Sequence, residues 1–145
     1  MSYTNATSTL EPPNQASPLM LDIQGLNVYY GESHILRNVD MGVAPGKMVC
    51  LIGRNGVGKT TLLKSVMGLL SPRSGAIALA GQPITQLSPD RRARLGIGYV
   101  PQGREIIPRL TIRENLILGL EALGDRGPKT QTIPEEIFEL FPVLK

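Results

Sequence analysis

A glycine-rich segment at residues 53–61, Gly-Arg-Asn-Gly-Val-Gly-Lys-Thr-Thr, contains the residue types that bind phosphate. It matches the pattern G-x-x-x-x-G-K-[ST] of the phosphate-binding loop, or P-loop. Gly56 and Gly58 lack a Cβ atom, so the backbone can turn tightly and direct its N–H groups at an anion. Lys59 can reach the outer phosphates with its positive charge, and the Thr60 hydroxyl can be a ligand of Mg²⁺. The segment therefore predicts a phosphate site at the N-terminus of a helix.

The segments on either side of the loop fit the elements that must position it. Residues 48–52 form a continuous apolar run, which predicts a strand buried on both faces, as in a parallel sheet. Cys50 lies inside this run, and we expect it to be a small core residue. The residues after Thr60 are apolar at helical spacing, which predicts a helix over 60–70 (Leu62, Leu63, Val66, Met67, Leu70). Strand, loop and helix thus follow one another in the order that a P-loop requires.

The rest of the chain predicts alternating strands and helices. Strands are expected at 21–30, at 39–43 as a half-exposed antiparallel strand, at 76–80 and at 97–100, with turns at 45–46 and 82–83. A short helix is expected from Pro89, with Ser88 as its N-cap, to Gly96. Thr111 and Glu114 form a capping box, which predicts a helix over 112–123, followed by a loop at 124–129 and a helix from Pro134 to about 140.

Composition narrows the class of protein. The chain has 145 residues, 41% hydrophobic and 19% charged, with a formal net charge of +3, which suits one globular domain or part of one. Arg91, Arg92 and Arg94 form the densest cationic group, which we interpret as a solvated helix face and not as a nucleic-acid site. No apolar run approaches 18 residues, so no direct membrane insertion is expected. Residues 1–18 are rich in Ser, Thr, Asn and Pro, which predicts a disordered tail.

Residues 19–145 resemble the N-terminal part of the ATP-binding subunit of an ABC transporter. Besides the P-loop, the resemblance rests on Tyr30 before Gly31, on the strand and turn at 79–84, and on Tyr-Val-Pro-Gln at 99–102. It implies an α/β fold with a P-loop NTPase (RecA-like) core and an antiparallel β subdomain. It also implies that 101–145 begin the helical subdomain.

The same resemblance implies a site for ATP and Mg²⁺. Tyr30 would stack on the adenine ring; Tyr29 is the alternative, because neighbouring strand residues face opposite ways. Gln102 would reach Mg²⁺ and the attacking water, so Gln102 and Lys59 are the expected catalytic residues, and Thr60 and Gln102 the metal ligands. The implied ATP-binding residues are the following: Tyr30, Gly53, Asn55, Gly56, Gly58, Lys59, Thr60 and, against the α-phosphate, Thr61.

A finer resemblance concerns the transported solute. Residues 102–111 with Glu-Asn-Leu at 114–116 resemble the branched-chain amino acid and urea importer group, and Pro-Gln-Gly-Arg-Glu at 101–105 is more similar to the urea type. The implied function is ATP binding and hydrolysis that powers import of a small nitrogenous solute, with urea expected and branched-chain amino acids as the alternative. The implied partners are membrane-spanning permease subunits, a second ATP-binding subunit (the same or different) and, indirectly, a periplasmic solute-binding protein. The implied location is peripheral, at the cytoplasmic face of the plasma membrane.

Several motifs of the family are absent from the printed sequence. These are the Leu-Ser-Gly-Gly-Gln signature, the Walker B strand with its Asp and catalytic Glu, and the switch histidine. His34 precedes the P-loop, and we expect it to face solvent. We therefore expect a domain truncated before the signature and Walker B segments, with an unpaired apolar edge at 48–52 and no transport-coupled ATPase of its own. A nucleotide-binding module without catalysis is the first alternative. A small kinase or DNA-repair ATPase is the second, although lid segments and coiled-coil heptads are lacking.

Overall fold

The computed structural model describes residues 19–103, 106–121 and 132–145. Its sheet is antiparallel throughout, with strand order β2-β1-β3-β4. The strands are β1 (Leu21–Tyr30), β2 (Ser33–Val43), β3 (Ser74–Leu79) and β4 (Gln82–Pro83). The strands expected at 21–30, 39–43 and 76–80 are thus confirmed, the second as the end of a longer strand that is antiparallel, as expected. The turn expected at 82–83 is wrong, because these residues pair with β3 and the chain turns at 80–81. The tail predicted at 1–18 and the loop predicted at 124–129 lie outside the described residues.

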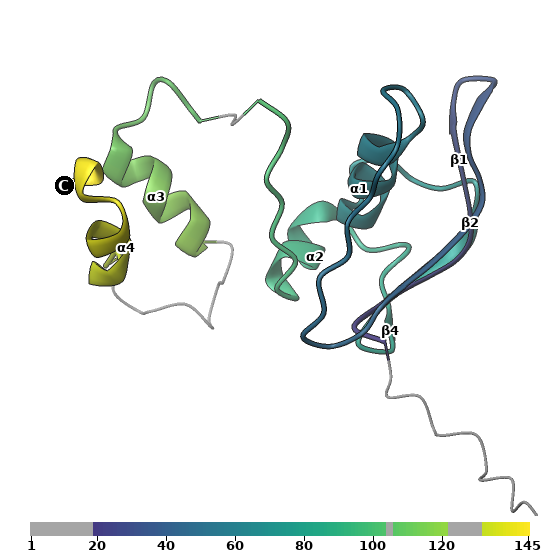
Figure 1. Ribbon diagram of the computed structural model, residues 1–145, viewed down its shortest axis with the longest axis horizontal. Coiled ribbons are helices and arrows are strands. Elements are labelled where there is room, and N and C mark those ends of the chain that lie inside the picture. Colours follow the sequence, from purple (N-terminus) through teal and green to yellow (C-terminus); the bar gives the residue numbers. More distant parts are fainter. Residues whose placement is uncertain (1–18, 104–105, 122–131) are drawn as a thin grey trace, which may run out of the picture.

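Helix α1 (Lys59–Met67) covers one face of this sheet (Figure 1). The core between them joins side chains of the strands, of α1 and of the segment after β4 (Ile23, Leu26, Val28, Leu36, Leu62, Val66, Ile77, Ile84). Gly68 ends α1 in the left-handed conformation, with φ of 78°. The helix expected after the loop is therefore confirmed, although Leu63, which we counted with its apolar face, is exposed.

Two apolar segments that we expected to be strands are not strands in the structure. Residues 48–52 and 97–100 have no strand pairing, and Met48 and Ile52 are 96% and 90% exposed. Cys50 is likewise exposed, so its assignment to the core is wrong. The physical reason is that a strand needs a neighbour to accept and donate its backbone hydrogen bonds. Within the described residues, no strand lies beside either segment, and the parallel core sheet is not formed there.

Helix α2 (Pro89–Arg94) begins after Ser88, as expected, and Gly96 follows its end with φ of 101°. The cationic group on this helix, however, is not a solvated face as a whole. Arg91 and Arg94 are exposed, but Arg92 is only 1% exposed. Its guanidinium donates to four backbone carbonyls at 2.7–2.9 Å (Ser65, Val66, Thr85, Leu87). Burial lowers the pKa of Arg92, and the carbonyl dipoles replace the water that its charge has lost.

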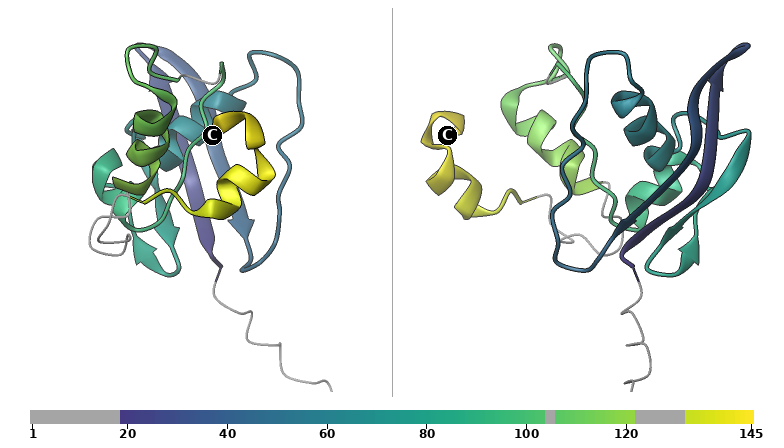
Figure 2. Two further views of the ribbon diagram at one scale, coloured as in Figure 1. Left: turned by 90° about the vertical axis from the view of Figure 1, so that its left-hand side faces the viewer. Right: turned by 45° about the vertical axis from the view of Figure 1, so that its right-hand side comes forward.

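Helices α3 (Ile112–Glu121) and α4 (Glu135–Leu140) lie on the far side of α1 and α2 from the sheet (Figures 1 and 2). A short 3-10 helix (Pro142–Leu144) follows α4. The capping box of α3 is confirmed: Glu114 Oε2 accepts from the Thr111 N–H at 2.8 Å, and the Glu114 N–H donates to Thr111 Oγ1 at 3.2 Å. The N–H and the hydroxyl of Thr111 both donate to the Glu114 carboxylate, and they hold the pKa of that carboxyl below its usual value. In the described part of the chain, no helix is long and apolar enough to cross a bilayer.

Candidate functional site

A hollow of about 310 Å³ opens where the P-loop meets the end of β1. We call it the P-loop hollow, and its lining residues come from β1, β2, the loop and the first turn of α1 (Tyr30, Ile35, Asn55, Gly56, Gly58, Lys59, Thr60, Thr61). Seven of these eight residues are among those the sequence assigned to the site. The sequence missed Ile35, which lies where β2 has a bulge between its pairings with Val28 and Tyr29. Such a bulge can turn a side chain toward a site, but periodicity alone does not predict it.

The loop needs glycine for two different reasons. Gly56 has φ of 83°, a conformation that disfavours any side chain, although a Cβ there would meet no other atom within 4 Å. Gly58 has φ of 101°, and a Cβ there would also lie 2.7 Å from Leu36 Cδ2 of the core. Glycine at position 58 therefore lets the first residue of α1 follow the loop directly while the loop packs against β2.

The first turn of α1 gives the P-loop hollow a positive electrostatic character. No acidic residue stands in this turn, so the partial positive charge of the helix N-terminus is uncompensated there. Lys59 Nζ donates to the carbonyl oxygens of Gly53 and Arg54, both at 2.7 Å, and so lies across the loop. Thr60 is exposed and Thr61 is buried, with its backbone in the helix. This arrangement suits an anion that meets several N–H groups and one ammonium group.

Tyr29 and Tyr30 lie in different environments. Tyr30 is 48% exposed and lines the P-loop hollow. Tyr29 stacks on His34, with ring centroids 4.1 Å apart and an angle of 10° between the planes. His34 is half-buried, so our expectation of a solvent-facing residue was wrong. Of the two tyrosines, only Tyr30 has a ring face available to a ligand in the hollow.

Gln102 is exposed and is not among the residues that line the P-loop hollow. It follows the segment 97–100, which is not held in a sheet in the described chain. The described residues also contain no cluster of three or more His, Cys, Asp or Glu side chains that could hold a metal ion. A magnesium ion at this site would therefore depend on Thr60, on Gln102, and on phosphate and water oxygens, which suits the chemistry of Mg²⁺.

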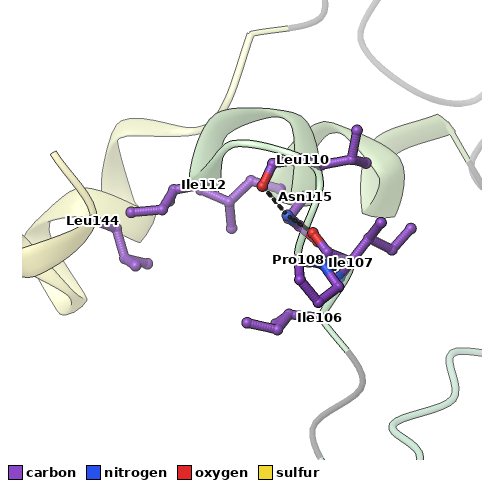
Figure 3. A pocket seen from close by; sticks show the side chains of 8 residues that line it. Ile106, Ile107, Pro108, Leu110, Ile112, Asn115 and Leu144 are labelled. Carbon is purple, nitrogen blue, oxygen red and sulfur yellow. Dashed lines mark hydrogen bonds between the residues drawn. The ribbon is translucent and has the colours of Figure 1, made fainter.

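A second, apolar hollow of about 490 Å³ lies beside α3 (Figure 3). Its walls are mainly aliphatic (Ile106, Ile107, Pro108, Leu110, Ile112, Asn115, Leu116, Leu144). Figure 3 shows Asn115 hydrogen-bonded across it to Ile107 and Leu110. Asn115 Oδ1 accepts from the Ile107 N–H at 2.9 Å, and its amide group donates to the Leu110 carbonyl at 3.1 Å. This side chain thus fixes the chain segment that leads into α3.

Comparison with known proteins assigns the class. The family model described as ABC transporter matches residues 36–143, which is most of the chain and includes the P-loop. The chain therefore belongs to the ABC transporter family.

Two curated relatives are similar to the chain over most of its length. The chain is 44% identical over 126 residues to the probable branched-chain amino acid transport ATP-binding protein LivF of Archaeoglobus fulgidus, covering 87% of this chain and 52% of that protein. It is 36% identical over 126 residues to the high-affinity branched-chain amino acid transport ATP-binding protein BraG of Pseudomonas aeruginosa, covering 87% and 53%. The chain thus spans about half the length of the relatives it matches.

Solved structures agree on the fold. One is an ATP-binding subunit of an ABC transporter, with a TM-score of 0.67 and 32% identity over 86% of this chain and 49% of that one. Another is a dimeric ATP-binding cassette in a post-hydrolysis state, bound to ADP and phosphate, with a TM-score of 0.66 and 29% identity over 81% and 52%. The fold is therefore that of an ABC ATPase, a P-loop NTPase, over the part of the cassette that the chain covers.

Proposed function

We propose that this chain binds Mg·ATP in the P-loop hollow, as part of the ATP-binding subunit of an ABC transporter. The observation that carries the proposal is that one hollow joins an exposed aromatic ring with the first turn of a helix after a glycine-rich loop. Tyr30 stacks on the base, since a flat π-face binds any nucleobase. The loop from Gly53 through Gly58 presents its N–H groups to the phosphates, and Lys59 exchanges its carbonyl partners for the outer phosphates.

Transport-coupled hydrolysis is a proposal for the assembled protein. In it, Thr60 and Gln102 are ligands of Mg²⁺, and Gln102 orients the attacking water, because an amide both donates and accepts a hydrogen bond. The exposed position of Gln102 outside the hollow means that its segment must move or be ordered to take part. The proposed partners are a second ATP-binding subunit and membrane-spanning permease subunits, with a solute-binding protein acting through the permease, at the cytoplasmic face of the membrane.

For the transported solute, we propose a branched-chain amino acid. The support is that both curated relatives described above have branched-chain amino acid transport in their names. The expectation of urea rested on the sequence Pro-Gln-Gly-Arg-Glu at 101–105, and neither of these relatives supports it. Uptake of labelled leucine and of labelled urea in cells that lack this chain distinguishes the two, and loss of urea uptake alone would contradict the proposal.

Nucleotide binding is tested by titrating the chain with Mg·ATP and, separately, with Mg·tripolyphosphate, which has the phosphates but no base. We expect both to bind and ATP to bind more tightly. Lys59→Ala should weaken both ligands at least about tenfold, since a charge-assisted contact contributes about 1.5–3 kcal/mol. The matched control is Lys64→Ala on the same helix, which should leave both affinities unchanged. Equal affinities of the wild type and Lys59→Ala for both ligands would contradict the proposed site.

A further inference from the structure

Arg73, Tyr29 and His34 form a three-layered arrangement that we call the Tyr29 stack. The Arg73 guanidinium carbon lies 4.0 Å from the centroid of the Tyr29 ring, and the His34 ring lies 4.1 Å from the same centroid, nearly parallel to it. A guanidinium over an aromatic face is attracted by the negative face of the ring. The stack thus brings together Arg73 and two residues, Tyr29 and His34, that are far from it in the sequence.

The His34 ring is held in a single orientation by Asn27. The Asn27 amide nitrogen donates to the Gly25 carbonyl at 2.9 Å and to Ser74 Oγ at 3.1 Å, so its other end is the acceptor. His34 Nε2 lies 2.9 Å from that oxygen and must therefore be the donor. The same oxygen accepts from the Asn38 N–H at 3.0 Å. A ring fixed by both a hydrogen bond and a stacking partner is pre-organised.

The stack lies directly beside the proposed base-binding residue. Tyr29 pairs with His34, and the next pair along the two strands is Tyr30 with Ser33. Neighbouring residues of a strand face opposite sides, so the stack occupies the side of the hairpin end away from the P-loop hollow. The turn after Tyr30 contains Gly31 at φ of 55°.

Arg73 connects this hairpin end to the chain that leaves the P-loop helix. It lies between α1 and β3, and its own N–H donates to the Asn27 carbonyl at 2.8 Å. The stack therefore fixes the end of β1 relative to the segment that follows α1. Since α1 carries the phosphate-binding turn, the spacing between Tyr30 and the phosphates depends on this connection.

We propose that His34 and Arg73 are positioning residues that hold Tyr30 over the P-loop hollow and so give the site its preference for a nucleobase. This inference rests on the proposed function. Neither side chain lines the hollow, so both act through Tyr30 and not by touching the ligand. Loss of either leaves the phosphate-binding turn intact and lets the tyrosine ring leave its stacking position.

The test is the ratio of the dissociation constants of Mg·tripolyphosphate and Mg·ATP, measured by titration calorimetry on the wild type and on variants. Tyr30→Ala should lower this ratio about fivefold or more, the weaker end of base–aromatic stacking, while Tyr30→Phe should keep it. His34→Ala and Arg73→Gln should lower the ratio in the same direction, with tripolyphosphate binding within about twofold of wild type. Arg73→Lys keeps a cation over the ring and should restore most of the preference.

The control is Arg91→Gln, an exposed arginine on α2 that should change neither affinity. A structural role alone would lower both affinities together and leave the ratio unchanged, and that result for His34→Ala and Arg73→Gln would overturn the inference. A normal ratio in Tyr30→Ala would overturn it as well. If the wild type bound neither ligand, the proposed function would fail and this inference with it, which is a distinct outcome.

Discussion

Replacement of Arg92 by methionine tests the account of the buried guanidinium. Met fills a similar volume but offers no donor, so the four carbonyls around it lose their partner. The Ser65 carbonyl keeps the Gly68 N–H at 3.1 Å. Three of the four acceptors have no second donor within the described part of the chain (Val66, Thr85, Leu87).

The magnitude follows from those three carbonyls. A buried acceptor left without a partner costs about 1–3 kcal/mol. Thr85 and Leu87 are half-buried, so water can reach part of the site and the lower end applies. We therefore expect Arg92→Met to lower the free energy of unfolding by about 3 kcal/mol, which corresponds to about 10 °C in Tm for a chain of this size. Gly68→Ala should act in the same direction, because its Cβ would lie 2.8 Å from Arg92 Nε.

The assay is equilibrium unfolding in urea followed by circular dichroism, with the slope of the transition compared between variants. Arg91→Met is the matched control, since Arg91 is exposed on the same helix and should change the unfolding free energy by about 0.5 kcal/mol or less. If the unfolding free energy of Arg92→Met were within about 1 kcal/mol of that of the wild type, the four hydrogen bonds would not be significant for stability. The reasoning about Arg92 would then be refuted.

Four further predictions concern single positions. Gly58→Ala should weaken binding of both Mg·ATP and Mg·tripolyphosphate and destabilise the fold by about 1–3 kcal/mol, because the residue has φ of 101° and its Cβ would meet Leu36; unchanged titrations would count against this. Gly119→Ala, in open space on α3, should instead stabilise by about 0.5–1 kcal/mol, and a lowered Tm would be the opposite result. Thr111→Ala should lower the free energy of unfolding by about 1 kcal/mol, because it removes the capping box, and unfolding in urea measures this change. The folded pKa of Glu114 is depressed, so its contribution to the free energy of unfolding is present above its ordinary pKa of 4.5 and is lost as the pH falls through the lower folded value. Glu114→Gln should therefore remove the dependence of the unfolding free energy on pH in that acid range. An unchanged dependence on pH would contradict this prediction.

Local patterns were enough to predict the elements that depend on local interactions. The helix at α1, the antiparallel strands and the capping box at Thr111 all follow from side-chain periodicity or from residues three apart. The two strands that failed to form depend on nonlocal partners. Residues 48–52 and 97–100 have strand-like composition, but a strand also needs a neighbour in space.

Three further features, at Arg92, Ile35 and His34, could not be predicted from the sequence for the same reason. From the sequence alone, Arg92 is indistinguishable from a surface cation. Only the folded chain brings four carbonyls from two other segments around its guanidinium. Ile35 reaches the P-loop hollow because β2 is bulged at that point, and a bulge shifts the two-residue periodicity. His34 was likewise assigned to solvent because its partners Tyr29 and Asn27 meet it only when β1 and β2 pair.

The central claim, that the P-loop hollow holds the phosphates of a nucleotide, is tested most directly by a crystal structure of the chain grown with Mg²⁺ and a slowly hydrolysed ATP analogue. We predict phosphate oxygens at hydrogen-bonding distance from the backbone N–H groups of residues 56–61, with the base against the Tyr30 ring. Lys59 Nζ, which lies 2.7 Å from the Gly53 and Arg54 carbonyls, should then contact the outer phosphates. Nucleotide bound elsewhere, with these two lysine contacts unchanged, would contradict the account.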